Sequence, residues 1–580
     1  MLLRLWRRIG QLSATELVGV AAWLVALGTL RYRIPYGVSH RDEAFYSAMP
    51  YSFLIGNQPY FDERTIQQSA GTLLLPAYRV YLAVVGSADG IVLFNRYLYL
   101  LCIGCCSLLV HRLLVRITSF TSACWAAAAL VTFGYFNLFA LSYNTQGALG
   151  FLCGVLLSAH ALLGPRPGRE LFVANLCFLA AIYSYPGLIV PLLPYNASVV
   201  AWLYWKTPLP TRRNGLIGLG AGLAAALLAF GAFALWLGKV RFERLREFQA
   251  SLGYGSVSGL SKLDFYHSDA WNWRWALLAY GAVFVLLPLA CCWFKRGLWL
   301  VALAGAAACV ASYRFSLGVT PTTSATLFFM AVTLLAPVCV ALNRSWRRGP
   351  FLLVFIWAPS IVSMLAVTYA SSNGLLAALL GSMGALIAGI GAFGALLEAR
   401  SRLNPQARQG YALVLIGFGA ACLGLEIDSM FRYVYDETGA TWGVHDTRIR
   451  SGPMRGTITT RANALTTEAV DRDLKRLADN AETLTIFDDF ATGYMSTRLR
   501  PQTWCQWIYW GLPEAFRRKL MTETFGAPAE LPDLVLKINV AKESRRLWAK
   551  YERNHYHTLV DRSELGYVIL ERNGAGTNPR

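Results

Sequence analysis

The chain has 580 residues, of which 55% are hydrophobic and 15% charged, and its mean hydropathy is +0.41. These values exclude an ordinary soluble protein and indicate one that crosses a membrane many times. The formal net charge is +20, and most of the excess lies in short loops that alternate along the chain. That pattern follows the positive-inside rule, so it argues against a nucleic-acid partner.

Apolar segments of membrane-spanning length follow one another over the first three quarters of the chain. We expect about thirteen helices, over residues 17–32, 91–114, 123–141, 146–163, 171–185, 188–205, 215–237, 275–294, 298–311, 325–342, 351–368, 375–397 and 411–430. Basic residues in the N-terminal tail and in every second loop place the N-terminus in the cytoplasm and the segment after residue 430 outside. We expect the bacterial cytoplasmic (inner) membrane as its location.

Two compositions meet near residue 431, which predicts a membrane domain over 1–430 and a soluble extracytoplasmic domain over 431–580. Residues 33–90 form a long outer loop, in which 43–55 and 72–85 could be helices lying along the membrane interface. In the soluble part, 484–487, 534–538, 557–560 and 567–570 have strand patterns. Residues 467–481, 513–524 and 541–553 have helical patterns, which predicts a small α/β domain.

Several kinds of site lack support in the sequence. Eleven of the twelve cysteines fall in or near predicted spans, where they fit as small packing residues, so a disulfide framework or a cysteine-ligated metal is not expected. Neither a glycine-rich dinucleotide fingerprint nor a P-loop occurs, so a nucleotide site is not expected.

An acidic pair, Asp42-Glu43, opens the outer loop. Adjacent helical residues point about 100° apart, so the two carboxylates can have different roles. Acids in a first turn commonly cap the helix, which is the simplest structural interpretation. The context favours a site, because Tyr46 and a second acidic pair, Asp62-Glu63, follow in the same loop.

The outer loop resembles that of the GT-C superfamily of polyprenyl-phosphate-sugar-dependent glycosyltransferases. Its members include protein O-mannosyltransferases, lipid A aminoarabinose transferases and mycobacterial arabinosyltransferases. The shared features are Asp42-Glu43 after the first span, the spacing from Glu43 to Tyr46, a two-helix loop, and Arg96 at the start of the next span. The layout of spans and the C-terminal domain complete the resemblance. It implies a GT-C fold and inverting transfer of a sugar to a hydroxyl of an extracytoplasmic glycan, glycolipid or protein.

The resemblance implies that Asp42 is the general base and Glu43 its supporting neighbour. Phosphate is a good leaving group that needs charge stabilisation more than a proton. We therefore expect cations near it, and the candidates are Arg314, Lys239, Arg241 and Arg96. The first three could instead be interfacial residues that extend toward water, and Arg96 could pair with an acid of the outer loop.

Neutral and acidic residues of the outer face could bind the acceptor or the sugar. The candidates are Tyr46, Asp62, Glu63, Tyr143, Asn144, Tyr369 and Asn373, with His267, Asp264 and Asp269 as weaker ones. Some relatives carry a further acid at the end of the third span, where this chain has Tyr143-Asn144, so the resemblance supplies no second catalytic carboxylate.

The soluble part contains Asp488-Asp489 and the aromatic residues Trp504, Trp507 and Trp510, which could stack on a glycan or pack against the membrane domain. No metal cofactor is required by the implied mechanism, although Asp42, Glu43, Asp62 and Glu63 could hold a divalent cation.

Two other functions fit the composition. A transporter or flippase of lipid-linked glycans would show ionisable groups near mid-bilayer, and the predicted spans carry charge mainly toward their ends. A non-catalytic glycan- or lipid-binding membrane protein would keep the same scaffold. Sugar, acceptor, polyprenol length and oligomeric state stay open.

Overall fold

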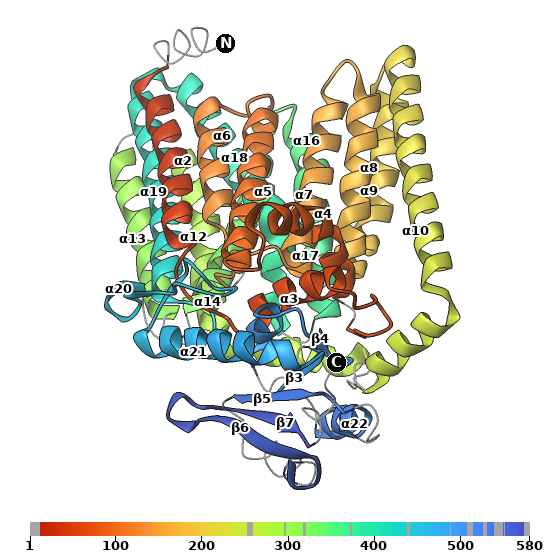
Figure 1. The fold of residues 1–580 in the computed structure, drawn as a ribbon. Coiled ribbons are helices and arrows are strands. Elements are labelled where there is room, and N and C mark those ends of the chain that lie inside the picture. Colours follow the sequence, from red (N-terminus) through yellow and green to blue (C-terminus); the bar gives the residue numbers. More distant parts are fainter. Residues whose placement is uncertain are drawn as a thin grey trace.

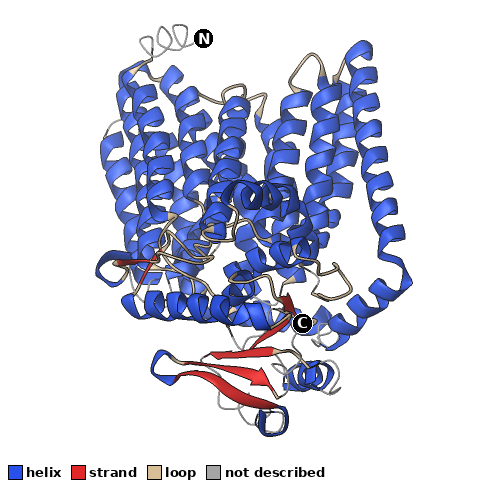
Figure 2. Ribbon diagram, in the orientation of Figure 1, coloured by secondary structure: helices blue, strands red, loops and turns tan. Residues whose placement is uncertain are grey.

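The computed structural model describes residues 12–573 except 66, 135, 252–258, 295–296, 317–320, 372–373, 438–440, 488, 507–513, 526–530, 539–548 and 550–551. Long, roughly parallel helices form a bundle, and a small sheet lies beyond one end of it (Figures 1 and 2). The first described helix, α2 (Ala14–Arg33), begins at the opposite end (Figure 1).

Nine helical segments in the described part of the chain are long and apolar enough to cross a membrane. They are α2 (Ala14–Arg33), α5 (Ile91–Leu114), α7 (Tyr143–Leu162), η1 with α9 (Pro186–Lys206), Leu209–Ala250 of α10 (Leu209–Ser251), α12 (Arg274–Trp293), α16 to α17 (Gly349–Ala370), η3 with α18 (Gly374–Leu403) and α19 (Arg408–Arg432). The chain is thus a multi-pass membrane protein, as predicted.

The other predicted spans coincide with helices that are shorter or less apolar. They are α6 (Phe120–Thr132), α8 (Pro167–Ser184), α13 (Leu298–Ser316), and α14 (Pro321–Val332) followed by α15 (Leu335–Leu342). The count of thirteen spans is therefore not confirmed.

The helix α6 ends nine residues before the predicted end of its span at residue 141. Phe136 and Asn137 have positive φ angles of 50° and 56°, which turn the chain back toward the bundle. The Asn137 amide donates hydrogen bonds to the carbonyls of Ser429 (2.8 Å) and Tyr433 (3.1 Å). The loop is apolar because it is buried against other helices, so hydropathy alone cannot separate it from a span.

The helix α10 continues past the predicted span end at residue 237. Gly238 has φ 60° inside it, a conformation that favours glycine, and the chain then stays helical to Ser251. The expected long loop over 238–273 is thus largely helical, since α11 (Gly259–Asn272) follows.

The outer loop contains the two predicted helices, α3 (Asp42–Leu54) and α4 (Gln68–Val85). Residues 42–52 of α3 are all buried, so other parts of the protein cover this helix. Residues after α19 cover it. The Tyr51 hydroxyl donates to the carbonyl of Thr497 (2.8 Å), and the Gln506 amide donates to the Ser52 hydroxyl (3.0 Å).

The C-terminal part begins with the short α20 (Thr441–Val444) and the paired strands β1 (Thr447–Arg448) and β2 (Ile458–Thr459). The helix α21 (Arg461–Leu477) then lies between the bundle and the main sheet (Figure 1). Its buried residues Ala464, Thr467, Val470 and Leu474 recur every three or four positions, as expected of an amphipathic helix.

Five strands form the main sheet in the order β4-β3-β5-β7-β6. They are β3 (Thr483–Phe487), β4 (Arg500–Pro501), β5 (Leu534–Ile538), β6 (Tyr556–Arg562) and β7 (Tyr567–Arg572). The strand β3 runs parallel to β4 and β5, and β7 is antiparallel to β5 and β6. With α22 (Glu514–Phe525), this confirms the four predicted strands and two of the three predicted helices; the predicted helix 541–553 lies mostly outside the described residues.

Candidate functional site

Glu43 is bound by Arg96, on α5. The carboxylate accepts hydrogen bonds from Arg96 Nε and Nη2, both at 2.5 Å, and the two side chains are almost completely buried. Arg96 also donates to the carbonyls of Ile34 (2.7 Å), Tyr36 (3.3 Å) and Gly37 (2.8 Å). A guanidinium has five N–H donors, so all of them are used.

The structure does not support the prediction that Arg96 binds the donor phosphate, because every N–H group of its guanidinium already has a partner. In this structure it has no donor left for a phosphate, and the contacts show the alternative, a structural pair with an outer-loop acid. Glu43 correspondingly links the start of α3 to α5.

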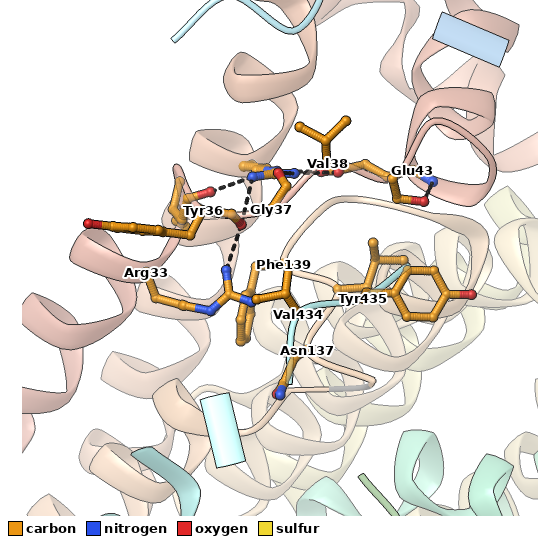
Figure 3. A pocket seen from close by; sticks show the side chains of 13 residues that line it. Arg33, Tyr36, Gly37, Val38, Glu43, Asn137, Phe139, Val434 and Tyr435 are labelled. Carbon is orange, nitrogen blue, oxygen red and sulfur yellow. Dashed lines mark hydrogen bonds and ion pairs between the residues drawn. The ribbon is translucent and has the colours of Figure 1, made fainter. Parts of the chain in front are cut away.

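A second buried guanidinium, Arg33, lies close to this pair (Figure 3). It donates to the carbonyls of Met430 (2.7 Å), Tyr36 (2.6 Å) and Tyr433 (3.4 Å), and so joins the end of α2 to the end of α19. The cavity between these side chains has about 10 Å³ of space for a water-sized probe, which is room for one water molecule and not for a sugar.

Asp42 keeps some contact with solvent. Its side chain is 12% exposed, against 1% for that of Glu43. The Ser39 hydroxyl accepts hydrogen bonds from the backbone N–H groups of Asp42 (3.2 Å) and Glu43 (3.4 Å), so serine, and not either acid, caps α3. The Asp42 carboxylate accepts a hydrogen bond from the Tyr435 hydroxyl and lies 3.8 Å from Arg41 Nε.

Two further carboxylates surround Arg41. Arg41 Nη2 lies 2.5 Å from Asp436, and Nη1 lies 3.9 Å from Asp489. The Ser39 hydroxyl also donates to Asp436 (2.5 Å), which has a positive φ of 59°. Burial, followed by repulsion from Asp42, raises the pKa of Asp436 to about 6. Asp42, Arg41, Tyr435, Asp436 and Asp489 are called the outer carboxylate cluster below.

Sequence reasoning missed the contribution of the residues just after α19. The signal was present, because Asp436-Glu437 is an acidic pair directly after the last span, as Asp42-Glu43 is after the first. Glu437 is bound by His445 (2.6 Å), by Thr459 and by Asn463 (2.7 Å). Burial opposes its charge, but these hydrogen bonds outweigh burial and hold the pKa of Glu437 below its ordinary value.

His40 connects the outer loop to the C-terminal part. Its ring nitrogens lie 2.8 Å from the Thr492 hydroxyl and 3.1 Å from the Thr467 hydroxyl, and the ring stacks on Phe490. Burial lowers the pKa of His40 to about 4, so the ring is neutral near pH 7.

Three tyrosines contact one another beside α3. Tyr46 lies one helical turn after Asp42, on the same side of α3. Its ring meets that of Tyr143 edge-on at 5.6 Å, and Tyr143 stacks on Tyr185 at 5.9 Å. The predicted sugar-binding residues Tyr46 and Tyr143 are thus in contact, and Asn144 is buried in the first turn of α7.

Asp62 and Glu63 bind partners outside the outer carboxylate cluster. Asp62 accepts a hydrogen bond from the backbone of Gln58 (2.7 Å). Glu63 is fully buried and accepts from the backbone N–H groups of Gln506 (3.0 Å) and Thr65 (3.1 Å). Burial raises the pKa of Glu63 to about 7. Within the described residues, no group of three or more His, Cys, Asp or Glu is placed to hold a metal ion, and Asp42, Glu43, Asp62 and Glu63 face different partners.

The predicted phosphate-binding cations on α10 make contacts within that helix. Lys239 lies 3.8 Å from Glu243, and Arg241 donates to the carbonyl of Trp236 (3.1 Å). Arg244, one turn further on, is the one that reaches the outer loop, because it donates to the carbonyl of Phe61 (2.8 Å). Arg314 belongs to α13, but its side chain lies outside the described residues.

The remaining candidates are dispersed. Tyr369 is exposed near the end of α17, and Asn373, Asp488, Trp507 and Trp510 lie outside the described residues. Asp269 accepts from the backbone of Leu375 (3.1 Å), and Asp264 and His267 are exposed on α11. Trp504 is buried between Phe248 and Phe516, so it packs in a core and offers no stacking face to a glycan.

One buried acid inside a span was also missed. Glu426 of α19 is 3% exposed, and neither of its carboxylate oxygens has a hydrogen-bond partner among the described residues. It lies between one and two turns from the C-terminal end of α19, at Arg432.

No protein-family model and no curated protein sequence matches the chain. Solved structures do match it. One is the crystal structure of the Archaeoglobus fulgidus oligosaccharyltransferase in complex with Zn and sulfate, with 12% identity, a TM-score of 0.49, and coverage of 93% of this chain and 71% of that one. Another is the archaeal oligosaccharyltransferase AglB from Archaeoglobus fulgidus in complex with an inhibitory peptide and a dolichol-phosphate, with 11% identity, a TM-score of 0.44, and coverage of 90% and 69%.

Proposed function

We propose that this protein is an inverting membrane glycosyltransferase that moves a sugar from a polyprenyl-phosphate donor to a hydroxyl of an extracytoplasmic acceptor. The bundle end that carries the sheet would face outward, and the N-terminus would lie in the cytoplasm of a bacterial cell, because the short basic loops lie on the N-terminal side.

The observation that supports the proposal most is that the adjacent acids Asp42 and Glu43 lie in different environments. Arg96 holds Glu43 in a buried, two-bond ion pair, whereas Asp42 is partly accessible and lies beside further carboxylates. A helix cap does not require this arrangement, since Ser39 already caps α3. A general base does require an accessible carboxylate in a fixed position.

In the proposed reaction, the acceptor oxygen forms a bond to the anomeric carbon as its proton passes to Asp42. The bond from that carbon to the phosphate oxygen breaks, and its electron pair leaves with the polyprenyl phosphate. Arg41 and the Tyr435 hydroxyl stabilise the Asp42 anion, and the ion pair of Arg41 with Asp436 fixes the guanidinium beside it.

The tyrosines beside Asp42 support sugar binding. The contact of Tyr46, Tyr143 and Tyr185 places aromatic rings along the side of α3 that carries Asp42, and the partly exposed Tyr143 is suited to stack on the apolar face of a sugar. Lys239, Arg241 and Arg314 stay candidates for the donor phosphate. No metal is required by this scheme, because cationic side chains can stabilise the leaving phosphate.

The test uses Asp42→Asn with purified protein and a panel of polyprenyl-phosphate sugars, and it measures release of polyprenyl phosphate in the presence of acceptor. We expect at least a hundredfold loss of turnover, since general-base catalysis contributes about 10²–10⁴-fold. The control is Glu564→Gln, an exposed acid in the turn before β7, which should keep full turnover. Near-normal turnover of Asp42→Asn would contradict the assignment.

A lipid-linked-glycan transporter is the second candidate, and Glu426 is the observation that favours it, because buried acids in spans often mark transport pathways. Reconstituted vesicles distinguish the two functions. A transporter moves the intact donor across the bilayer and releases no polyprenyl phosphate, and its activity depends on Glu426 but not on Asp42.

A further inference from the structure

A large basic pocket lies at the end of the bundle opposite the sheet. It is formed where α5 and α15 end, where α16 begins and where α18 ends, and its volume is about 680 Å³. Figure 1 shows α16 near the N-terminal end of the molecule, far from the strands. By the positive-inside rule this end faces the cytoplasm.

The charge of the pocket is strongly positive. One glutamate, Glu398, and five arginines line it: Arg344, Arg347, Arg348, Arg400 and Arg402. Among the described residues, only Arg402 of these five is ion-paired, to Glu398 at 2.7 Å. Arginines gathered in one concavity repel one another, so a bound anion would stabilise this arrangement.

The walls of the pocket are fixed by hydrogen bonds between the elements. The Asn343 amide donates to the carbonyl of Ala395 on α18 (3.5 Å), and the Trp346 indole donates to the carbonyl of Ile117 after α5 (3.3 Å). The pocket therefore exists before any ligand arrives, which reduces the entropic cost of binding.

The lining is apolar as well as basic. Leu342, Trp346, Ala395 and Leu403 line it together with the arginines, and Leu403 is 77% exposed at the end of α18. A free phosphate would use only the arginines. A phospholipid would place its phosphate on the arginines and its glycerol and upper acyl chains against the apolar residues.

We propose that this pocket binds the head group of an anionic phospholipid of the cytoplasmic leaflet. Basic pockets between membrane helices on the cytoplasmic side are suited to such head groups, and a pocket volume of a few hundred Å³ matches a ligand of this size. The inference is independent of the proposed sugar transfer, because the pocket and the outer carboxylate cluster lie at opposite ends of the bundle.

The test is native mass spectrometry of the delipidated protein in detergent, titrated with dioleoylphosphatidylglycerol or with dioleoylphosphatidylcholine. We expect a phosphatidylglycerol adduct at concentrations where phosphatidylcholine gives none. In the variant Arg344→Gln/Arg347→Gln/Arg348→Gln, we expect the phosphatidylglycerol affinity to fall about a hundredfold. Removal of one cation near a membrane surface lowers the affinity about tenfold or less, and this variant removes three.

The matched control is Arg166→Gln/Arg169→Gln/Arg213→Gln, which removes the same charge from exposed residues on the same face but outside the pocket. It should retain the adduct. An equal loss in both triple variants would overturn the proposal, because it would show attraction to the whole face.

Inorganic phosphate at the same concentrations is the second arm. If it raises the thermal midpoint of unfolding as much as phosphatidylglycerol does, the site takes a soluble anion and the proposal fails. Arg400→Gln, on the other wall, provides an independent variant if the triple substitution impairs folding, and it should weaken phosphatidylglycerol binding several-fold.

Discussion

Asp42 and Glu43 show how neighbouring acids acquire different properties from their partners. Glu43 meets a guanidinium that uses all its donors, and the pair is closed to water. Asp42 meets a tyrosine hydroxyl and a shared arginine, with Asp436 and Asp489 on the other side of that arginine. The 100° step between adjacent residues of α3 is what separates the two environments.

Removing the charge of Glu43 should destabilise the fold. In Glu43→Gln, Arg96 stays buried without a carboxylate, and breaking a buried pair in this way costs about 3–5 kcal/mol. We expect a clear fall in the thermal midpoint of unfolding in detergent. The double variant Glu43→Gln/Arg96→Gln should lose less stability than the two single variants lose together. If the losses simply add, the two residues do not act as a pair.

Asp436 should control how activity depends on pH, if the proposed function holds. Its pKa of about 6 means that it loses its proton between about pH 5 and 7, and its anion then holds Arg41, which lies beside Asp42, in place. We expect turnover to rise over this range in the wild type. Asp436→Asn should lack the rise and be roughly fivefold slower at pH 8, from about 1 kcal/mol of lost ion pairing with Arg41. A variant profile that still rises near pH 6 would assign the titration to another group.

Close helix contact in the membrane bundle depends on particular glycines. A Cβ at Gly218 of α10 would lie 2.0 Å from the backbone oxygen of Gly168 in α8, whereas a Cβ at Gly220 would meet nothing within 4 Å. Gly218→Ala must therefore push α8 and α10 apart, at a cost of about 1–3 kcal/mol. Gly220→Ala should be neutral or slightly stabilising, because alanine favours a helix. Comparison of thermal midpoints tests this, and equal effects would contradict it.

Helices and strands whose apolar residues recur at a regular spacing were predictable from the sequence, and irregular segments were not. The strands β3, β5, β6 and β7 and the helices α3 and α4 lie where local patterns place them. The early end of α6 was missed because the buried loop after it is as apolar as a membrane span. The bend at Gly238 was missed because the helical extension after it is charged, as a loop would be.

The site was predictable only where it is local in sequence. Asp42-Glu43, Tyr46 and Tyr143 were singled out from motifs near the first spans, and the structure brings Tyr46 and Tyr143 into contact. Tyr435 and Asp436 approach Asp42 from almost 400 residues further along, through the packing of α19 on α2 and the hydrogen bonds of Arg33. A pairing between such distant segments is not encoded in any local pattern.

At the scale of the whole molecule, the outer loop and the C-terminal part fold as one structure. Backbone hydrogen bonds join Gly37 to Ile458 (2.8 Å) and Arg64 to Trp504 (2.9 Å). Arg64 also pairs with Glu523 of α22 (3.0 Å). The C-terminal part therefore holds α3 in place, and loss of these contacts should disturb the outer carboxylate cluster.

Glu63 makes this connection sensitive to pH. It binds the backbone of Gln506 from a fully buried position, and burial raises the pKa of Glu63 from 4.5 to about 7. The folded protein thus holds a proton that the unfolded chain releases between pH 4.5 and 7. The stability that comes from this group is greatest below pH 4.5 and is lost as the pH rises to about 7.

Glu63→Gln should remove this dependence, because glutamine is neutral at every pH. Between pH 5 and 8, the wild type should lose about 3 kcal/mol more stability than the variant, which the thermal midpoint of unfolding in detergent can follow. Glu564→Gln, an exposed acid of the C-terminal part, should keep the wild-type dependence. Parallel curves of stability against pH for the wild type and Glu63→Gln would contradict this prediction, because they would show that Glu63 stays ionised in the folded protein. The junction between the outer loop and the C-terminal part would then contain a buried charge stabilised by backbone N–H groups alone.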